Sequence, residues 1–142
     1  MNIEPVLERM AAELAAALPQ GNPWRGRIYA TVAEPKDGLA TWGTLYCTGE
    51  PREIVAGNAT MQAECKLYAQ LLPAEGPWSA VQVRRFAWEL CERAHAYLRS
   101  VQGMRGEVAY LVLGAHPSPG AMQAEAAVGY TVEMPFTLTV QF

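Results

Sequence analysis

The clearest structural signal in the chain is MQAECKLYAQL at residues 61–71, in which apolar and polar side chains alternate strictly. Because successive side chains of a strand point to opposite faces, this period of two predicts a half-buried strand. A second alternating stretch, YTVEMPFTLTVQF, follows at residues 130–142. Pro135 interrupts it, and since proline has no N–H to donate to a ladder, we expect this strand to lie at an edge of the sheet or to bulge there.

Two amphipathic helices are predicted, over residues 2–18 and from Ser79 to about residue 101. In both, apolar residues recur at steps of three and four, so each helix has one apolar stripe with which it can cover a sheet. Asn2 and Ser79 are the expected N-caps, because such side chains accept hydrogen bonds from the first unpaired backbone N–H groups of a helix.

The remaining predicted strands are shorter. Residues 27–32 and 41–48 have strand-like patterns, and the Asp-Gly pair at 37–38 favours a hairpin between them, although the connection is longer than two residues. Residues 49–58 predict a loop or a broken strand. Residues 108–113 are apolar on both faces, which predicts a strand in the centre of the sheet.

This order of elements predicts an α+β fold. We expect residues 1–142 to form a single two-layer domain, with a mixed, mostly antiparallel sheet and two main helices packed on one of its faces. A hydrophobic content of 51% with 18% charged residues excludes a disordered tail and supports a buried core.

The charge and the cysteines argue against two further classes of protein, those that bind nucleic acid through overall charge and those built on a disulfide framework. Eleven basic and fourteen acidic residues give a net charge of −3, which argues against a grip on nucleic acid through overall charge. Cys47, Cys65 and Cys91 are odd in number and widely spaced, so we expect reduced structural thiols in a cytoplasmic setting rather than a disulfide framework. The amino-terminal residues lack the pattern of a signal peptide.

No reactive centre is evident in the sequence. His95 and His116 are the only histidines, and neither has a second ligand at metal spacing. Neither a P-loop nor a G-x-G-x-x-G motif occurs. We therefore predict no catalytic residue, no cofactor site and no metal ligand. A thiol and a histidine can still meet in space, so a small cysteine-dependent enzyme stays open as an alternative.

Bulky residues outside the apolar stripes are candidates for an interface. Tryptophan and arginine dominate the binding energy of protein interfaces. The alternative interpretation is that these tryptophans only cover the edges of the core. The two adjacent arginines of the second helix are expected to serve as a structural or interface pair. The candidate interface residues are Trp24, Trp42, Trp78, Trp88, Arg84 and Arg85.

Four stretches in this order carry a resemblance to a known family: MNIEPVLERMAAELAAAL, MQAECKLYAQLL, SAVQVRRFAWELCERAHAYLRSV and YTVEMPFTLTVQF. Their pattern and order resemble the tail terminator (tail completion) proteins of long-tailed bacteriophages over the whole chain. The resemblance implies a subunit without catalytic residues, which forms a hexameric ring at the head-proximal end of the tail tube. Such a ring ends tube polymerisation and joins the tail to the head.

The same resemblance implies partners and a location. The partners are further copies of the chain, the tube protein and a head-completion or connector protein, and DNA passes through without specific binding. The protein lies in the virion, and in the host cytoplasm during assembly, with no membrane contact. A negative bore repels the phosphate backbone, and the candidate acids for it are Glu34, Asp37, Glu50 and Glu53. Two further classes of protein stay open, namely another neck or tail component (a head-closure or tube protein) and a ligand-binding module.

Overall fold

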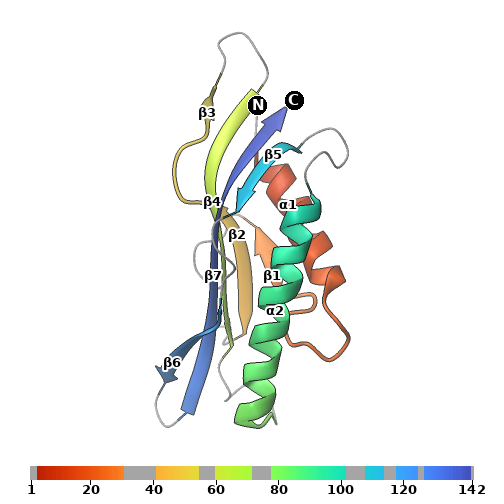
Figure 1. Ribbon diagram of the computed structural model, residues 1–142, viewed down its shortest axis with the longest axis vertical. Coiled ribbons are helices and arrows are strands. Elements are labelled where there is room, and N and C mark those ends of the chain that lie inside the picture. Colours follow the sequence, from red (N-terminus) through yellow and green to blue (C-terminus); the bar gives the residue numbers. More distant parts are fainter. Residues whose placement is uncertain are drawn as a thin grey trace.

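The computed structural model describes residues 3–30, 41–54, 60–71, 78–101, 108–113, 118–124 and 127–141. In this part of the chain, two helices cover one face of a seven-stranded mixed sheet (Figure 1). The predicted α+β class is therefore confirmed. The elements in chain order are α1 (Glu4–Ala17), β1 (Ile28–Ala30), β2 (Trp42–Cys47), β3 (Arg52–Glu53), β4 (Thr60–Leu71), α2 (Ala80–Ser100), β5 (Val108–Leu113), β6 (Gly120–Ala124) and β7 (Ala127–Gln141).

The centre of the sheet is the ladder between β4 and β7. The two strands pair antiparallel and without a break from Thr60 opposite Gln141 to Leu71 opposite Tyr130. The strand order is β1-β2-β4-β7-β5, with β3 paired to the beginning of β4 and β6 paired to the beginning of β7. Both central strands come from the alternating stretches, which supply one apolar face along their whole length.

The predicted hairpin between the first two strands is wrong. β1 and β2 are parallel neighbours, with Ile28 opposite Gly43. A two-residue turn returns the chain antiparallel, whereas a parallel neighbour requires a connection that crosses back to the other end of the sheet. The Asp-Gly pair on which the prediction depended lies in residues 31–40, outside the described part of the chain.

The prediction for Pro135 is also wrong, since β7 lies between β4 and β5 and keeps its register with β4 through the Lys66–Pro135 pair. Thr48 N donates a hydrogen bond to Glu64 O, so the backbone N–H and C=O of Glu64 point toward β2. Lys66, two residues further along β4, directs its backbone groups to the same side. Pro135, which is opposite Lys66, therefore directs its backbone groups away from β4. Because of this orientation, the missing N–H of the proline removes no hydrogen bond between β4 and β7. On that other side, the pairing with β5 ends at Phe136.

Strand β5 lies at the end of the strand order and not in the centre as predicted. Its inward residue Leu111 is buried, but Val112 is exposed on the opposite face. A short apolar strand can be buried on both faces in the centre of a sheet, or it can lie at an edge with one apolar side chain exposed. The sequence pattern alone did not distinguish these two cases. Strand β6 was missed altogether, because the turn-rich segment 114–120, with two prolines and two glycines, extends to its first residue, Gly120.

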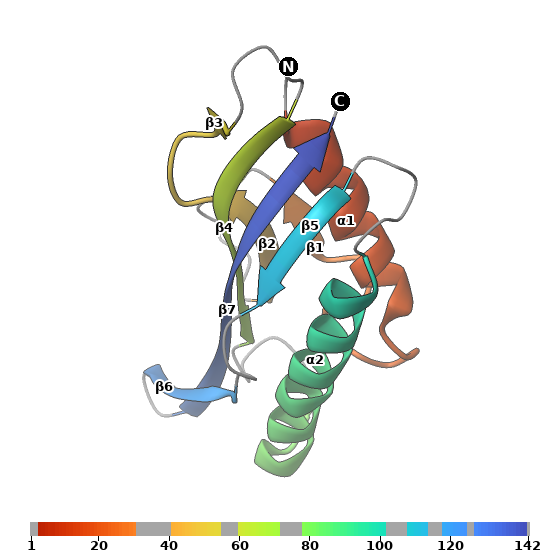
Figure 2. The same cartoon turned by 45° about the horizontal axis from the view of Figure 1, so that its top comes forward.

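The core lies between the two helices and the sheet (Figure 2). α1 packs against β1 and β2, and α2 packs against β7 and β5. A hydrogen bond from Tyr97 Oη to Glu13 Oε2, at 2.6 Å, joins the two helices. The predicted stripe of α2 is buried throughout: its members are Val83, Ala87, Leu90, Cys91, Ala94, Leu98 and Val101.

The two helix starts differ in how they are capped. Ser79 caps α2 as predicted: its side chain accepts from Gln82 N, and Gln82 Oε1 accepts from Ser79 N, which is a complete capping box. At α1 the N-cap is Ile3 without a side-chain hydrogen bond, so the expected cap is shifted by one residue. Asn2 lies outside the described residues.

Candidate assembly surfaces

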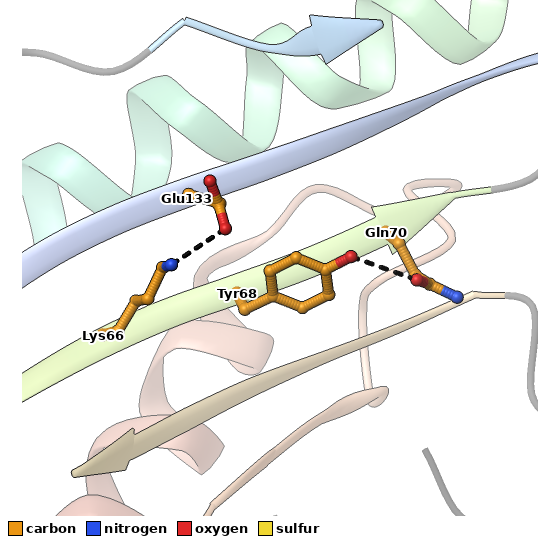
Figure 3. Close-up of polar contacts among 4 residues, drawn as sticks. All are labelled: Lys66, Tyr68, Gln70 and Glu133. Atoms are coloured by element: carbon orange, nitrogen blue, oxygen red, sulfur yellow. Dashed lines mark hydrogen bonds and ion pairs between the residues drawn. The ribbon is translucent and has the colours of Figure 1, made fainter. Parts of the chain in front are cut away.

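The sheet face that points away from the helices is polar and ordered by side-chain contacts. Figure 3 shows Lys66, Tyr68 and Gln70 of β4 and Glu133 of β7 on this face. Lys66 Nζ lies 2.8 Å from Glu133 Oε1, and Tyr68 Oη donates to Gln70 Oε1 at 3.2 Å. These contacts cross from β4 to β7 and run along β4, so we call the surface carrying these four residues the open sheet face.

A shallow groove of about 610 Å³ lies beside the Lys66–Glu133 pair. Glu64, Val112 and Pro135 contribute to its lining, so it combines charged and apolar side chains. A surface of this mixed composition is typical of the exposed part of a protein interface.

Lys66 and Tyr68 on this face are unsuited to acid–base work near neutral pH. The hydrogen bond to Glu133 raises the pKa of Lys66, so the ammonium group keeps its proton. Burial, with the Glu133 carboxylate adding, raises the pKa of Tyr68, so the phenol stays neutral. A general base needs a pKa near the working pH, and both groups are shifted away from it.

The cysteines are likewise shifted away from reactivity. Burial raises the pKa of Cys47 and Cys65, and that of Cys91 to about 11. Only a thiolate is a nucleophile, so such thiols attack slowly at neutral pH. His95 lies on α2, and His116 lies outside the described residues. The part of the chain that the structure describes holds no cluster of three or more His, Cys, Asp or Glu side chains able to bind a metal.

Two predicted interface anchors are buried in the subunit. Trp24 is inaccessible, and its Nε1 donates to Trp42 O at 3.2 Å and to Gln70 O at 3.1 Å. Trp42 is 3% exposed and its ring lies 5.4 Å from that of Tyr68. Neither side chain is accessible to a partner from this position, so the interface prediction for these two is corrected. Trp24 belongs to the core, whereas Trp42, opposite Gln70, is covered on the sheet face that carries Tyr68.

The remaining candidates lie on or beside α2. Trp78 is half-buried and packs edge-on against Phe86 at 5.7 Å, and the guanidinium of Arg85 lies 5.9 Å from the same ring. Arg84 and Arg85 are exposed, and Trp88 is 39% exposed. Of the six candidates, Trp88 and the two arginines thus present side chains to solvent.

Val81 completes a surface that was not predicted from the sequence. It is 77% exposed, and positions three, four and seven apart share one face of a helix. Val81, Arg84, Arg85 and Trp88 therefore form one stripe on the side of α2 that points away from the core, which we call the α2 outer stripe. An apolar residue off the buried stripe was the signal that could have revealed it.

Among the solved structures that resemble this subunit, one matches it over its full length. It is a chain from the "Virion of native gene transfer agent (GTA) particle", with a TM-score of 0.50, 12% sequence identity and coverage of 100% of both chains. The two chains share a fold. At this identity the likeness concerns the fold alone. No family model matches the sequence, and no curated protein matches it either.

The structure separates the four candidate acids. Glu34 and Asp37 lie outside the described residues, while Glu50 and Glu53 are exposed next to and within β3. Glu50 also lines a hollow with Glu4 at the beginning of α1. Among the described helices, none combines the length and the apolar character that crossing a membrane requires.

Proposed function

We propose that this protein is a structural subunit of a virion and that it acts as a tail terminator, forming a ring at the head-proximal end of the tail tube. The observation that carries the proposal is the likeness to a chain of a gene transfer agent virion, which extends over 100% of both chains. The element order that resembles tail terminator proteins supports the finer assignment.

The distribution of surfaces supports assembly into a closed ring. A ring of identical subunits needs two different complementary patches, one on each side of the subunit. The α2 outer stripe lies on the helix layer, and the open sheet face lies on the other side of the sheet. The stripe offers an exposed tryptophan flanked by arginines. Beside the Lys66–Glu133 pair of the open sheet face, the exposed Glu64 of the groove offers a carboxylate that complements these arginines in charge.

The charge of the chain supports passage of DNA through such a ring. Six copies of a chain with a net charge of −3 make an acidic assembly, which repels phosphates. Glu50 and Glu53 are exposed near one end of the sheet and are the described candidates for the bore. In this proposal the tube protein and a head-completion or connector protein bind the two rims of the ring.

The test is removal of the chain from the particle that encodes it. Without a terminator, we expect tubes of uncontrolled length and heads without tails in electron micrographs, and addition of the purified protein to these tubes should cap one end of each. Tubes of normal length joined to heads would contradict the proposal. Filaments formed by the purified protein alone would instead assign it as the tube protein.

A further inference from the structure

Cys47 and Cys65 lie side by side on neighbouring strands. Cys47 is the last residue of β2, Cys65 lies within β4, and the two are directly opposite in the antiparallel register. Their side chains therefore point to the same face of the sheet, and the two Sγ atoms are 3.9 Å apart. Both thiols are free in the structure.

The backbone at this pair suits a covalent link. Thr48 N donates to Glu64 O at 2.9 Å, so Thr48 and Glu64 are a hydrogen-bonded pair and Cys47 and Cys65 are the adjacent non-hydrogen-bonded pair. Such pairs have a Cα–Cα distance of about 4.5 Å, inside the range of roughly 4.4–6.8 Å that disulfides span. Closing the bond requires the sulfur atoms to approach by roughly 2 Å.

The two thiols differ in their exposure to solvent. Cys65 is 2% exposed, whereas Cys47 is half-exposed and lines a hollow of about 650 Å³. Glu4 of α1 and Glu50, which precedes β3, lie on the same hollow. An incoming reagent therefore reaches the sulfur of Cys47 first, and Cys65 is placed behind it as the resolving thiol.

We propose that Cys47 and Cys65 are an oxidation site at which a small-molecule disulfide closes an internal disulfide between β2 and β4. The Cys47 thiolate attacks one sulfur of the reagent and expels the first small thiol, which leaves a mixed disulfide on Cys47. Cys65 loses its proton to solvent and attacks Cys47 Sγ, which expels the second small thiol. The protein loses two protons and two electrons, and the reagent is reduced to two thiols.

Conditions decide whether the pair is open or closed. Burial raises the pKa of both thiols, and the carboxylates of Glu4 and Glu50 add to the effect at Cys47, so the reaction quickens as the pH rises above neutral. A reducing cytoplasm keeps Cys47 and Cys65 as two free thiols, and an oxidising medium converts them into the disulfide. That a released virion meets such a medium rests on the proposed function, whereas the disulfide itself does not.

The test uses the purified full chain, oxidised glutathione and three variants. We expect the native chain to lose about two mass units, for two hydrogens, and to retain one of its three thiols, at Cys91. Cys91→Ala should behave in the same way with no thiol left. Cys47→Ala and Cys65→Ala should show no loss of two mass units, and only Cys65→Ala should hold a lasting glutathione adduct on Cys47.

A second readout covers a variant that folds poorly. A disulfide that encloses residues 48–64 should raise the melting temperature of the native chain by roughly 5–10 °C, and reductant should reverse the shift. The proposal is overturned if the folded native chain retains all three thiols at pH 9, keeps a glutathione adduct on Cys47, or forms only disulfides between chains.

Discussion

Trp24 shows how one residue can close the edge of a core. Its segment lies between α1 and β1, and its ring fills a buried site while its N–H satisfies two carbonyls, those of Trp42 and Gln70, at the end of the β2–β4 ladder. The local sequence, NPWRG, fits an exposed turn as well as a buried one. Its location could not be predicted because both acceptors lie on strands far away in the chain.

Replacing Trp24 by phenylalanine should measure how much this indole N–H contributes to the free energy of unfolding. Trp24→Phe keeps an aromatic ring but leaves two buried carbonyls without their shared donor, so we expect a loss of about 1–3 kcal/mol of unfolding free energy. Trp88→Phe is the matched control, because Trp88 is partly exposed, and should change stability by less than about 0.5 kcal/mol. Equal urea midpoints for the two variants would contradict the assignment.

The buried thiols should make the protein sensitive to alkali. Burial, with Glu92 adding, raises the pKa of Cys91 from about 9 to about 11, so the folded state holds this proton more tightly than the unfolded chain does. The contribution of the protonated Cys91 thiol to the free energy of unfolding is complete below pH 9. It is lost as the pH rises through 11, which lowers this free energy by roughly 1–3 kcal/mol.

Urea unfolding at pH 8 and pH 10.5, with reductant present, measures this loss. We expect Cys91→Ala to lose less stability between the two pH values than the native chain does. An identical loss in both proteins would show that the Cys91 thiol does not contribute to the alkaline transition.

Among the elements, those with a long local pattern were predictable. The period of two fixed β4 and β7 to within a few residues, and the period of 3.6 with Ser79 fixed α2. Which strands become neighbours is a property of the assembled sheet. For that reason the parallel pairing of β1 with β2, the edge position of β5 and the interior position of Pro135 were not predicted.

The capping box of α2 gives a direct test at this scale. Ser79→Ala removes the acceptor for Gln82 N, and we expect it to cost about 0.5–2 kcal/mol of unfolding free energy. Ser79→Asp retains an acceptor at the same position and should stay within a few tenths of a kcal/mol of the native protein. If both variants lost the same amount, the cap would not contribute to stability.

For the whole molecule, the proposed function depends on surfaces rather than on a reactive centre. The sequence identified Trp88 and the two arginines of the α2 outer stripe, but it missed Val81 and the grouping of Lys66, Tyr68, Gln70 and Glu133 on the open sheet face. The polar side of β4 was visible in the alternation. Its contact with Glu133 depends on the β4–β7 register, which brings residues 67 positions apart into contact.

Charging the α2 outer stripe should block assembly without unfolding the subunit. Val81→Asp combined with Trp88→Asp places two charges in the proposed contact, and since both side chains are exposed, we expect only a small change in urea midpoint. Capping of tail tubes should fall at least tenfold. Ile54→Asp is the control, because Ile54 is an exposed apolar residue, at 44%, outside the stripe. Equal capping by both proteins would exclude the stripe from the interface.

The most direct measurement is a cryo-electron microscopy reconstruction of the particle that encodes this chain. We predict that the subunit fits density as a closed ring between the tail tube and the head, with the α2 outer stripe of each copy in contact with its neighbour. Subunits repeated along the length of the tube, or density for the chain nowhere in the particle, would contradict the proposed function.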